Sequence, residues 1–251
     1  MERHALRDDQ FARIEKLLPG RPGTIGRNSD LGNRLFVDAV IWKFRVGVPW
    51  RDLPERFGGW CNTHKRFSRW AVTGVWASLF NALADDPDNE YAMIDATVVR
   101  AHQHAAGAVK RGSRPSHRPL ARRAHDENPC DRRRLGQSVG AQPTGGQVHD
   151  ITQADALLAL VEPEALLADK GYDADHFVES LTARAIKVVI PPKSNRKVKR
   201  DCDFALYCER NIVERFFNMI KHFRAIATRY EKTAQNFLAG LHLVCALAWL
   251  K

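Results

Sequence analysis

The chain is organised around the stretch YCERNIVERFFNMIK, at residues 207–221. In an α-helix, where each residue turns by about 100°, four of its polar residues fall within about 60° of one another: Tyr207, Arg210, Glu214 and Lys221. The opposite stripe, about 100° wide, is apolar and suits packing against a core: Ile212, Phe216, Met219, Ile220 and Phe223. The pattern predicts a helix that packs by one face and displays a phenol, a guanidinium, a carboxylate and an ammonium on the other. An ordinary amphipathic helix with a solvated charged face would show the same pattern.

The composition is that of a globular protein with an excess of positive charge. The chain has 251 residues, 44% hydrophobic and 27% charged, which is enough material for one large domain or two modest ones. Its formal net charge of +10 favours a polyanionic partner, most simply nucleic acid. The five cysteines form no CxxC pair, so we expect free thiols in a reducing cytoplasm and neither a zinc ribbon nor a disulfide framework.

No targeting or membrane segment is expected. The N-terminal MERHALRDDQF lacks the apolar run of a signal peptide. Residues 237–250 are apolar but contain His242 and are short for a membrane span. We therefore expect a buried amphipathic helix there, no membrane partner and a cytoplasmic location.

The first 85 residues are predicted to be helical. Capping and breaking residues place four helices at about 8–18, 30–47, 62–70 and 74–83. The third helix is basic and follows a glycine turn at 58–59; its candidate DNA-binding residues are His64, Lys65, Arg66 and Arg69. Such an arrangement resembles a helix-turn-helix unit, whose basic side chains reach phosphates and base edges of DNA. A small helical bundle with a solvated basic face is the alternative.

Beyond the acidic linker at 85–90 the pattern changes to alternating strands and helices. Two short apolar runs, 91–95 and 165–169, each end in an aspartate, and a third run at 186–190 is rich in β-branched residues. Helices are expected between them, at 155–161 and 175–185. This alternation predicts an α/β domain.

Three carboxylates from these elements can form a metal site. Asp95 and Asp169 end the first two strands, and Glu214 comes from the polar helix face. Mg²⁺ prefers oxygen ligands, and a pair of such ions can activate a water or hydroxyl and stabilise the leaving oxygen in a displacement at phosphorus. Each aspartate alone would be interpreted as a turn or cap residue. The combination with the polar helix face is what indicates a metal site.

These motifs resemble the DDE transposases of bacterial insertion sequences, in the group named for insertion sequence five. The resemblance covers most of the chain and rests on the following segments: PWRDLPERFGGW at 49–60, IDATVVRAHQHAAG at 94–107, GQVHDITQA at 146–154, ADKGYDAD at 168–175, IPPKSNRK at 190–197, and the block at 207–250. The family signature is Tyr, two residues, Arg, three residues, Glu, six residues, Lys. Tyr207, Arg210, Glu214 and Lys221 meet it without adjustment.

The resemblance implies an RNase H-like fold in which Asp95, Asp169 and Glu214 bind Mg²⁺ or Mn²⁺, as a pair of ions. It also implies cleavage at terminal inverted repeats, attack of the freed 3′-hydroxyl on target DNA, and a homo-oligomer in the DNA complex, associated with the nucleoid. Arg210 and Lys221 would hold phosphates near the scissile bond, and Tyr207 would orient terminal nucleotides. These residue types suit those roles, because arginine binds phosphate bidentately, lysine acts as a point charge and tyrosine offers a ring for stacking.

A basic run follows the third predicted strand. Residues 193–200, KSNRKVKR, contain five basic residues out of eight. Beside a phosphodiester site we expect contact with the DNA backbone from Lys193, Arg196 and Lys197. A solvated charge run is the alternative.

Residues 111–143 depart from the family pattern. They contain eight arginines and four prolines but no isoleucine and no aromatic residue, where related transposases carry a strand with Thr-Lys-Ile-His and its partner. Nothing there alternates like a strand pair, so we expect the strand bearing Asp95 to have an unpaired edge.

Our hypothesis is that this segment is translated in a shifted reading frame between two compensating changes. A genuine basic DNA-binding loop is the alternative. The gene decides between them, because one of the other two frames should recover a Thr-Lys-Ile-His-like strand; if neither does, the hypothesis fails.

The predicted fold is α/β, an RNase H-like mixed sheet flanked by helices and preceded by a small all-α helix-turn-helix-like domain. The predicted domains are a DNA-binding domain at 1–85 and a DDE catalytic domain at 91–251. Residues 111–143 are an aberrant segment of the second domain, and one interpretation is that this segment is disordered. The predicted function is a transposase that performs metal-dependent cleavage and strand transfer. Two alternatives stay open: a catalytically inactive remnant that only binds DNA, and an RNase H-like nuclease without strand transfer.

Overall fold

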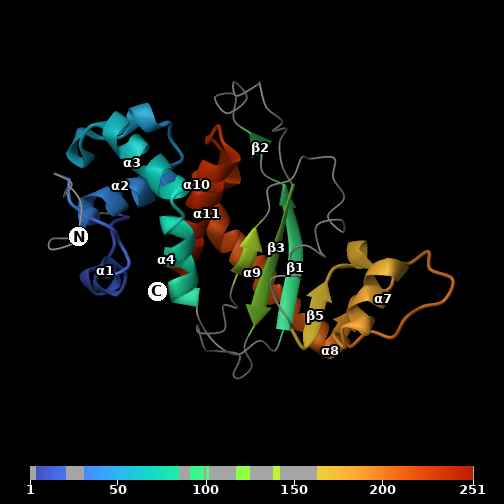
Figure 1. Ribbon diagram of the computed structural model, residues 1–251. Coiled ribbons are helices and arrows are strands. Elements are labelled where there is room, and N and C mark those ends of the chain that lie inside the picture. Colours follow the sequence, from blue (N-terminus) through green and yellow to red (C-terminus); the bar gives the residue numbers. More distant parts are fainter. Residues whose placement is uncertain are drawn as a thin grey trace. The chain divides into compact units, whose positions relative to one another are not determined.

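The computed structural model describes residues 4–20, 31–84, 91–98, 100–101, 117–124, 138–141 and 163–250 (Figure 1). These residues form two compact units. The first takes in the described residues up to Ala84, residues 100–101 and residues 219–250, and the second takes in the remainder. Residues 85–90, where we predicted the domain boundary, lie outside the described residues. Residues 219–250 belong to the same unit as the N-terminal helices, and the predicted domain bounds stay a prediction.

The first unit is helical. Its elements are α1 (Asp8–Glu15), α2 (Asn33–Val46), η1 (Trp50–Asp52), η2 (Glu55–Phe57), α3 (Trp60–Val72), α4 (Val75–Ala84), α10 (Arg224–Ala227), α11 (Ala234–Trp249) and a parallel pair of short strands, β2 (Arg100–Ala101) and β7 (Thr228–Arg229). The four helices predicted in the first 85 residues are present. Gly47 ends α2 with φ +74, a left-handed conformation that glycine adopts without strain. A Cβ there would lie 2.4 Å from Cβ of Arg224, so glycine also allows the close approach of α10.

Aromatic rings fill the core of the first unit. Trp76 lies within 5.2–6.1 Å of the ring centres of Phe36, Phe67 and Trp70. Helix α11 packs against α4, where His242 stacks on Phe80 at 5.7 Å. Most side chains of α11 are buried, which explains the apolar run that we assigned to a buried helix. Among the described residues, no helix is both long and apolar enough to cross a membrane.

The second unit contains a five-stranded mixed sheet in the order β4-β3-β1-β5-β6. Its strands are β1 (Tyr91–Val98), β3 (His117–Ala124), β4 (Ser138–Ala141), β5 (Ala165–Ala168) and β6 (Lys187–Val189). Strands β1, β5 and β6 are parallel, whereas β3 runs antiparallel to both β1 and β4. The remaining elements are η4 (Lys170–Tyr172), α7 (Asp175–Ala183), α8 (Phe204–Tyr207), η5 (Cys208–Arg210) and α9 (Asn211–Lys221), whose last turn belongs to the first unit.

Helix α7 covers β5 and β6 with an apolar face (Figure 1). Phe177 and Leu181 of this helix are fully buried against Leu166 of β5 and Ile186, the residue before β6. Burying a side chain of this size contributes about 1.5–3 kcal/mol. This core fixes the strand ends from which the predicted site residues come.

The expectation of an unpaired edge on β1 is wrong. Strand β3 pairs with β1 from Tyr91 opposite Ala124 to Val98 opposite His117, and β4 pairs with β3 across a bulge after Ala121. Backbone N–H and C=O groups make this ladder, so it does not need the side-chain alternation that we looked for. The reading-frame hypothesis concerns the gene and stays a prediction, and the predicted helix at 155–161 lies outside the described residues.

Candidate metal and nucleic-acid site

The register of two parallel strands brings two predicted metal ligands together in the backbone. Strand β1 pairs with β5 from Tyr91 opposite Ala165 to Ile94 opposite Ala168. Asp95 follows Ile94 and Asp169 follows Ala168, so the two aspartates are the next residues on adjacent strands, which lie about 4.8 Å apart. The side chain of Asp95 lies outside the described part of the chain.

The carboxylate of Asp169 is fixed by the turn that follows β5. Asp169 caps η4, and its Oδ1 accepts a hydrogen bond of 2.7 Å from the backbone N–H of Gly171. A Cβ on Gly171 would lie 2.7 Å from the same oxygen, closer than van der Waals contact allows. Glycine at this position therefore lets the backbone approach and orient the carboxylate.

Residues 204–221 form a nearly continuous helical segment, in which the 3₁₀ turn η5 lies between α8 and α9. Side chains three residues apart eclipse in a 3₁₀ turn, which aligns Tyr207 with Arg210. Nη1 of Arg210 donates a hydrogen bond of 3.1 Å to Oε1 of Glu214, whose side chain is 58% exposed. Burial raises the pKa of Tyr207, the charge of Arg210 opposes this rise, and the charge of Asp169 adds to it. The charges of Arg210 and Asp169 therefore both act on the pKa of Tyr207, and Arg210 bonds to Glu214.

The apolar stripe predicted for this helix is buried at Phe216 and Ile220 of α9 and at Phe223 just after it, and Met219 is half-buried. The side chain of Ile212 lies outside the described part of the chain. Phe217, which we did not assign to the stripe, is buried as well. Lys221, the last residue of α9, is exposed and belongs to the first unit.

The donor set suits a hard divalent cation. Asp169 and Glu214 offer carboxylate oxygens, the ligands that Mg²⁺ prefers, and the backbone of Asp95 lies beside that of Asp169. Among the side chains that the structure describes, no group of three or more His, Cys, Asp or Glu residues is gathered closely enough to hold a metal ion. That set does not include the side chain of Asp95, and the carboxylate class of all three residues fits the ion.

The basic run at 193–200 is tied to the turn after Asp169. Arg196 donates from Nε to Oδ2 of Asp173 at 3.0 Å and from Nη2 to Oδ1 of Asp175 at 2.8 Å. Arg196 is therefore engaged within the protein, a role that its position in a basic run did not suggest. Lys193 is half-buried, whereas Lys197 is exposed.

The four predicted DNA-binding residues of α3 divide into two pairs. Lys65 and Arg69 are exposed, one helical turn apart. Arg66 is buried, with its guanidinium 4.2 Å from the ring of Phe36, and burial, together with the charge of Arg69, lowers its pKa to about 10. His64 is half-buried beside Trp50, and burial lowers its pKa. Lys65 and Arg69 are thus the exposed members of this set, and DNA contact by any of the four stays a prediction.

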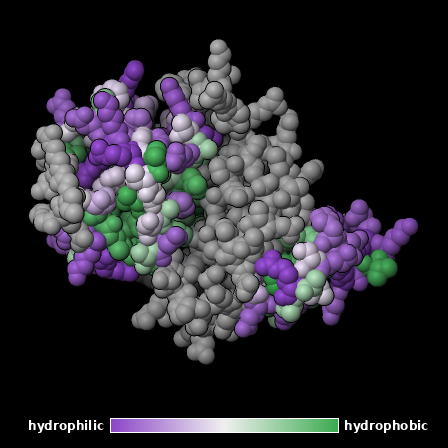
Figure 2. Space-filling model, in the orientation of Figure 1, coloured by the Kyte–Doolittle hydropathy of each residue, from purple (hydrophilic) through white to green (hydrophobic). Residues whose placement is uncertain are grey.

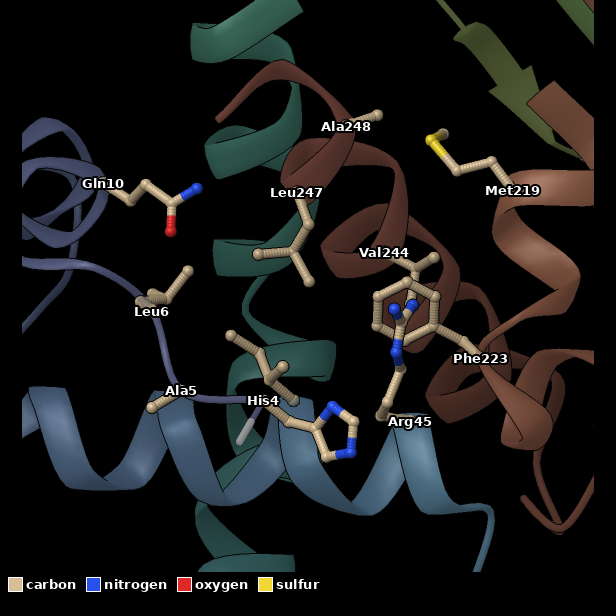
Figure 3. A pocket seen from close by; sticks show the side chains of 11 residues that line it. His4, Ala5, Leu6, Gln10, Arg45, Met219, Phe223, Val244, Leu247 and Ala248 are labelled. Carbon is tan, nitrogen blue, oxygen red and sulfur yellow. The ribbon is translucent and has the colours of Figure 1, made fainter. Parts of the chain in front are cut away.

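A separate cavity of about 180 Å³ lies in the first unit (Figure 3). Its lining is mostly apolar and comes from the N-terminal segment, α2, α9, α11 and Phe223, over whose ring the guanidinium of Arg45 lies at 4.5 Å. Figure 2 shows hydrophobic residues gathered on the visible face among α1, α2 and α4. The cavity holds no carboxylate and is not a candidate metal site.

Comparison with known proteins identifies the family. Residues 6–80 match the family model "Putative transposase of IS4/5 family", and residues 166–251 match "Transposase DDE domain". A putative transposase for insertion sequence element IS6501 from Brucella ovis is 38% identical over 120 residues, covering 47% of this chain and 92% of the relative.

Two further relatives are similar over comparable lengths. An uncharacterized protein from Sinorhizobium fredii is 50% identical over 109 residues, covering 43% of this chain and 86% of the relative. A putative transposase for insertion sequence element IS402 from Burkholderia cepacia is 30% identical over 143 residues, covering 48% of this chain and 65% of the relative. The chain belongs to the DDE transposases of bacterial insertion sequences, which confirms the resemblance. Transposases act on DNA, and DDE domains generally use divalent metal ions.

Proposed function

We propose that this chain cleaves DNA at the terminal inverted repeats of an insertion sequence and joins the freed 3′-hydroxyl to target DNA. The observation that carries the proposal is the register of Asp95 and Asp169 on adjacent parallel strands. The neighbouring Tyr207, Arg210 and Glu214 support it, as does the mixed sheet, which suits an RNase H-like arrangement.

Asp95, Asp169 and Glu214 would hold two divalent cations, Mg²⁺ or Mn²⁺. When bound, such ions activate the attacking water or hydroxyl and stabilise the leaving oxygen. The Gly171 N–H holds the Asp169 carboxylate at the strand end. Arg210 orients Glu214 through Nη1, and its guanidinium is suited to bidentate phosphate contact.

Tyr207 and Lys221 complete the proposed set of residues. A tyrosine hydroxyl, with an ordinary pKa of about 10, is protonated at neutral pH, so that of Tyr207 can donate a hydrogen bond, while its ring offers a stacking surface for a terminal base. Lys221 is exposed and would add a point charge for a phosphate.

The proposed DNA-binding domain at 1–85 would position the repeat, and the proposed catalytic domain at 91–251 would cut it, within a homo-oligomer on the DNA. Lys65 and Arg69 are the residues of α3 that are exposed for phosphate contact. The arrangement of α2, the glycine turn and α3 supports a helix-turn-helix-like role.

The test is nicking of a labelled repeat end in Mg²⁺ or Mn²⁺. Asp95→Ala, Asp169→Ala and Glu214→Ala should each abolish cleavage while binding of the repeat is largely retained. Glu179→Ala, at an exposed position of α7, is the matched control and should cleave normally. Unchanged cleavage by the Asp169 variant would refute the assignment. Wild-type binding without nicking would indicate a remnant, and equal cutting of duplexes without the repeat would indicate a general nuclease.

A further inference from the structure

Asp173 is a buried carboxylate that gathers three donors from one segment. Its side chain is 2% exposed. Oδ2 accepts from the backbone N–H of Lys193 at 2.8 Å and from Nε of Arg196 at 3.0 Å, and Oδ1 accepts from Nη1 of Arg200 at 2.6 Å. A buried charge is tolerated only when it is paired and hydrogen-bonded, and here the three donors to Asp173 all come from the segment 193–200.

We call the segment 193–200 the basic strap. It leads from β6 to α8 and appears in Figure 1 as the orange loop that extends beyond α7. The chain before the strap and the chain after it are joined by an ion pair, in which Nζ of Lys187 lies 2.7 Å from Oδ2 of Asp203. Asp173 is thus an internal anchor for a segment that is otherwise held at its two ends.

The anchor divides the charges of the basic strap. Arg196 and Arg200 each bridge Asp173 and Asp175, so two guanidinium groups face two carboxylates within the protein. Lys197 and Lys199 are exposed. The side chains of the strap that remain for an external anion are therefore lysines.

The anchor also lies next to the proposed metal ligand. Asp169 caps the one-turn helix η4, and Asp173 is the residue that ends it. Asp173 lies four positions after Asp169, a rise of about 8 Å along a 3₁₀ axis. A strap fixed on Asp173 is therefore held close to the strand end that carries Asp169.

We propose that Asp173 is a positioning residue that holds the basic strap beside Asp169, so that Lys197 and Lys199 contact the DNA backbone next to the scissile phosphate. The inference rests on the proposed function and deepens it. It assigns Arg196 to anchoring, where we expected DNA contact, and adds Lys199 to the contact residues. Without Asp173 the strap keeps its positive charges, but Lys197 and Lys199 are no longer held beside Asp169.

The test compares two variants that carry the same net charge. Asp173→Asn and Asp175→Asn each remove one negative charge, so electrostatics alone would strengthen DNA binding in both. Asp175 is 66% exposed, and without it Asp173 still holds all three donors of the strap. Binding to a repeat-end duplex is measured as a function of salt concentration, and trypsin cleavage after Lys197 and Lys199 is measured in free protein.

Asp173→Asn should weaken DNA binding, whereas Asp175→Asn should not. Asp173→Asn should bind DNA about tenfold more weakly at 0.1 M salt, and its salt slope should fall by about 1–2, the loss of one or two phosphate contacts. Trypsin should cleave its strap faster. Asp175→Asn should bind at least as tightly as wild type, and Lys197→Gln with Lys199→Gln should reproduce the loss of slope.

A variant with unchanged charge covers the case in which Asp173→Asn does not fold. Arg196→Lys combined with Arg200→Lys keeps both charges but loses the forked donors that bridge the two aspartates, and it should also weaken binding. Undiminished DNA binding by this variant, or by folded Asp173→Asn, overturns the inference and leaves the proposed function intact. Failure of the wild-type protein to bind duplex DNA overturns both.

Discussion

Nη1 of Arg210 lies 3.1 Å from Oε1 of Glu214, one helical turn further along the chain. The arginine side chain is 16% exposed and the glutamate side chain 58% exposed. Arg210 is thus held in place and presents a guanidinium to a carboxylate that is open to solvent. In the proposed reaction the same guanidinium orients Glu214 and contacts a phosphate.

Replacing Arg210 by lysine should therefore slow cleavage while leaving DNA binding nearly unchanged. Lysine keeps the charge but cannot bond a carboxylate and a phosphate in the forked geometry of arginine. A hydrogen bond to a charged group is worth about 1.5–3 kcal/mol, which corresponds to about a 10–100-fold slower rate. Single-turnover nicking measures the effect, and Arg215→Lys, at an exposed position of α9, is the control. A cleavage rate equal to that of wild type would contradict the role assigned to Arg210.

The sequence was sufficient to locate the elements that carry the site, because each has a strong local pattern. The apolar runs before Asp95 and Asp169 are strands, and the stripe with Phe216 and Ile220 is buried. Strands β3 and β4 could not be predicted, because their sequences do not alternate between apolar and polar residues. Pro119 has no N–H to donate to the ladder, and a proline usually argues against an interior strand.

Basic residues were harder to interpret than apolar ones. A run of charges does not say which members find partners inside the protein, because those partners lie far along the chain. Arg66 packs on Phe36, thirty residues earlier, and Arg196 bonds to Asp173. Asp173, which accepts hydrogen bonds from the segment 193–200, had no local signal that distinguishes it from a solvated carboxylate.

Arg66 and Arg69 give a matched test of this distinction. Arg66→Ala should destabilise the protein by about 1–3 kcal/mol, because it removes buried cation–π contacts and hydrogen bonds. The guanidinium lies over the rings of Phe36 and Trp70. It also donates to the carbonyl of Gly32 and to Oδ1 of Asn33. Arg69→Ala should change stability by less than about 0.5 kcal/mol but weaken DNA binding and reduce the salt slope by about 0.9. Urea unfolding and DNA titration on both variants measure the two effects. The prediction fails if Arg66→Ala is as stable as Arg69→Ala.

The stability contributed by Asp173 should depend on pH in a defined direction. Burial alone would raise its pKa, but hydrogen bonds from the Lys193 N–H and Arg196, with the charges of Arg196 and Arg200, lower it overall. The folded state therefore binds this proton less tightly than the unfolded state does. The contribution is fully present above the ordinary pKa of about 3.9 and is lost as pH falls through the lowered value. The difference in unfolding free energy between wild type and Asp173→Asn should accordingly be constant from pH 7 to 5 and shrink below pH 4. A difference that grows on acidification would be incompatible with this account.

Lys43 and Glu231 form a buried ion pair within the first unit. Nζ of Lys43 bonds to Oε1 of Glu231, which also accepts from Nε1 of Trp50 at 3.0 Å. Both side chains are nearly inaccessible to solvent, and burial lowers the pKa of Lys43 against the opposing charge of Glu231. The pair connects α2 to the segment just before α11, so it helps to hold the C-terminal helix among the N-terminal ones.

Removing one partner of this pair should cost more than removing both. Lys43→Met leaves the Glu231 carboxylate buried without its ion-pair partner, although the Trp50 N–H still donates to it, and such a change destabilises by about 3–5 kcal/mol. Lys43→Met combined with Glu231→Leu replaces the pair by apolar groups of similar volume, and its stability should lie within about 1–2 kcal/mol of wild type, since such replacements are often neutral or stabilising. Urea unfolding followed by tryptophan fluorescence measures all variants of the cycle. If Lys43→Met alone is as stable as the double variant, the carboxylate finds another partner or water, and the pair does not hold α11 in the first unit.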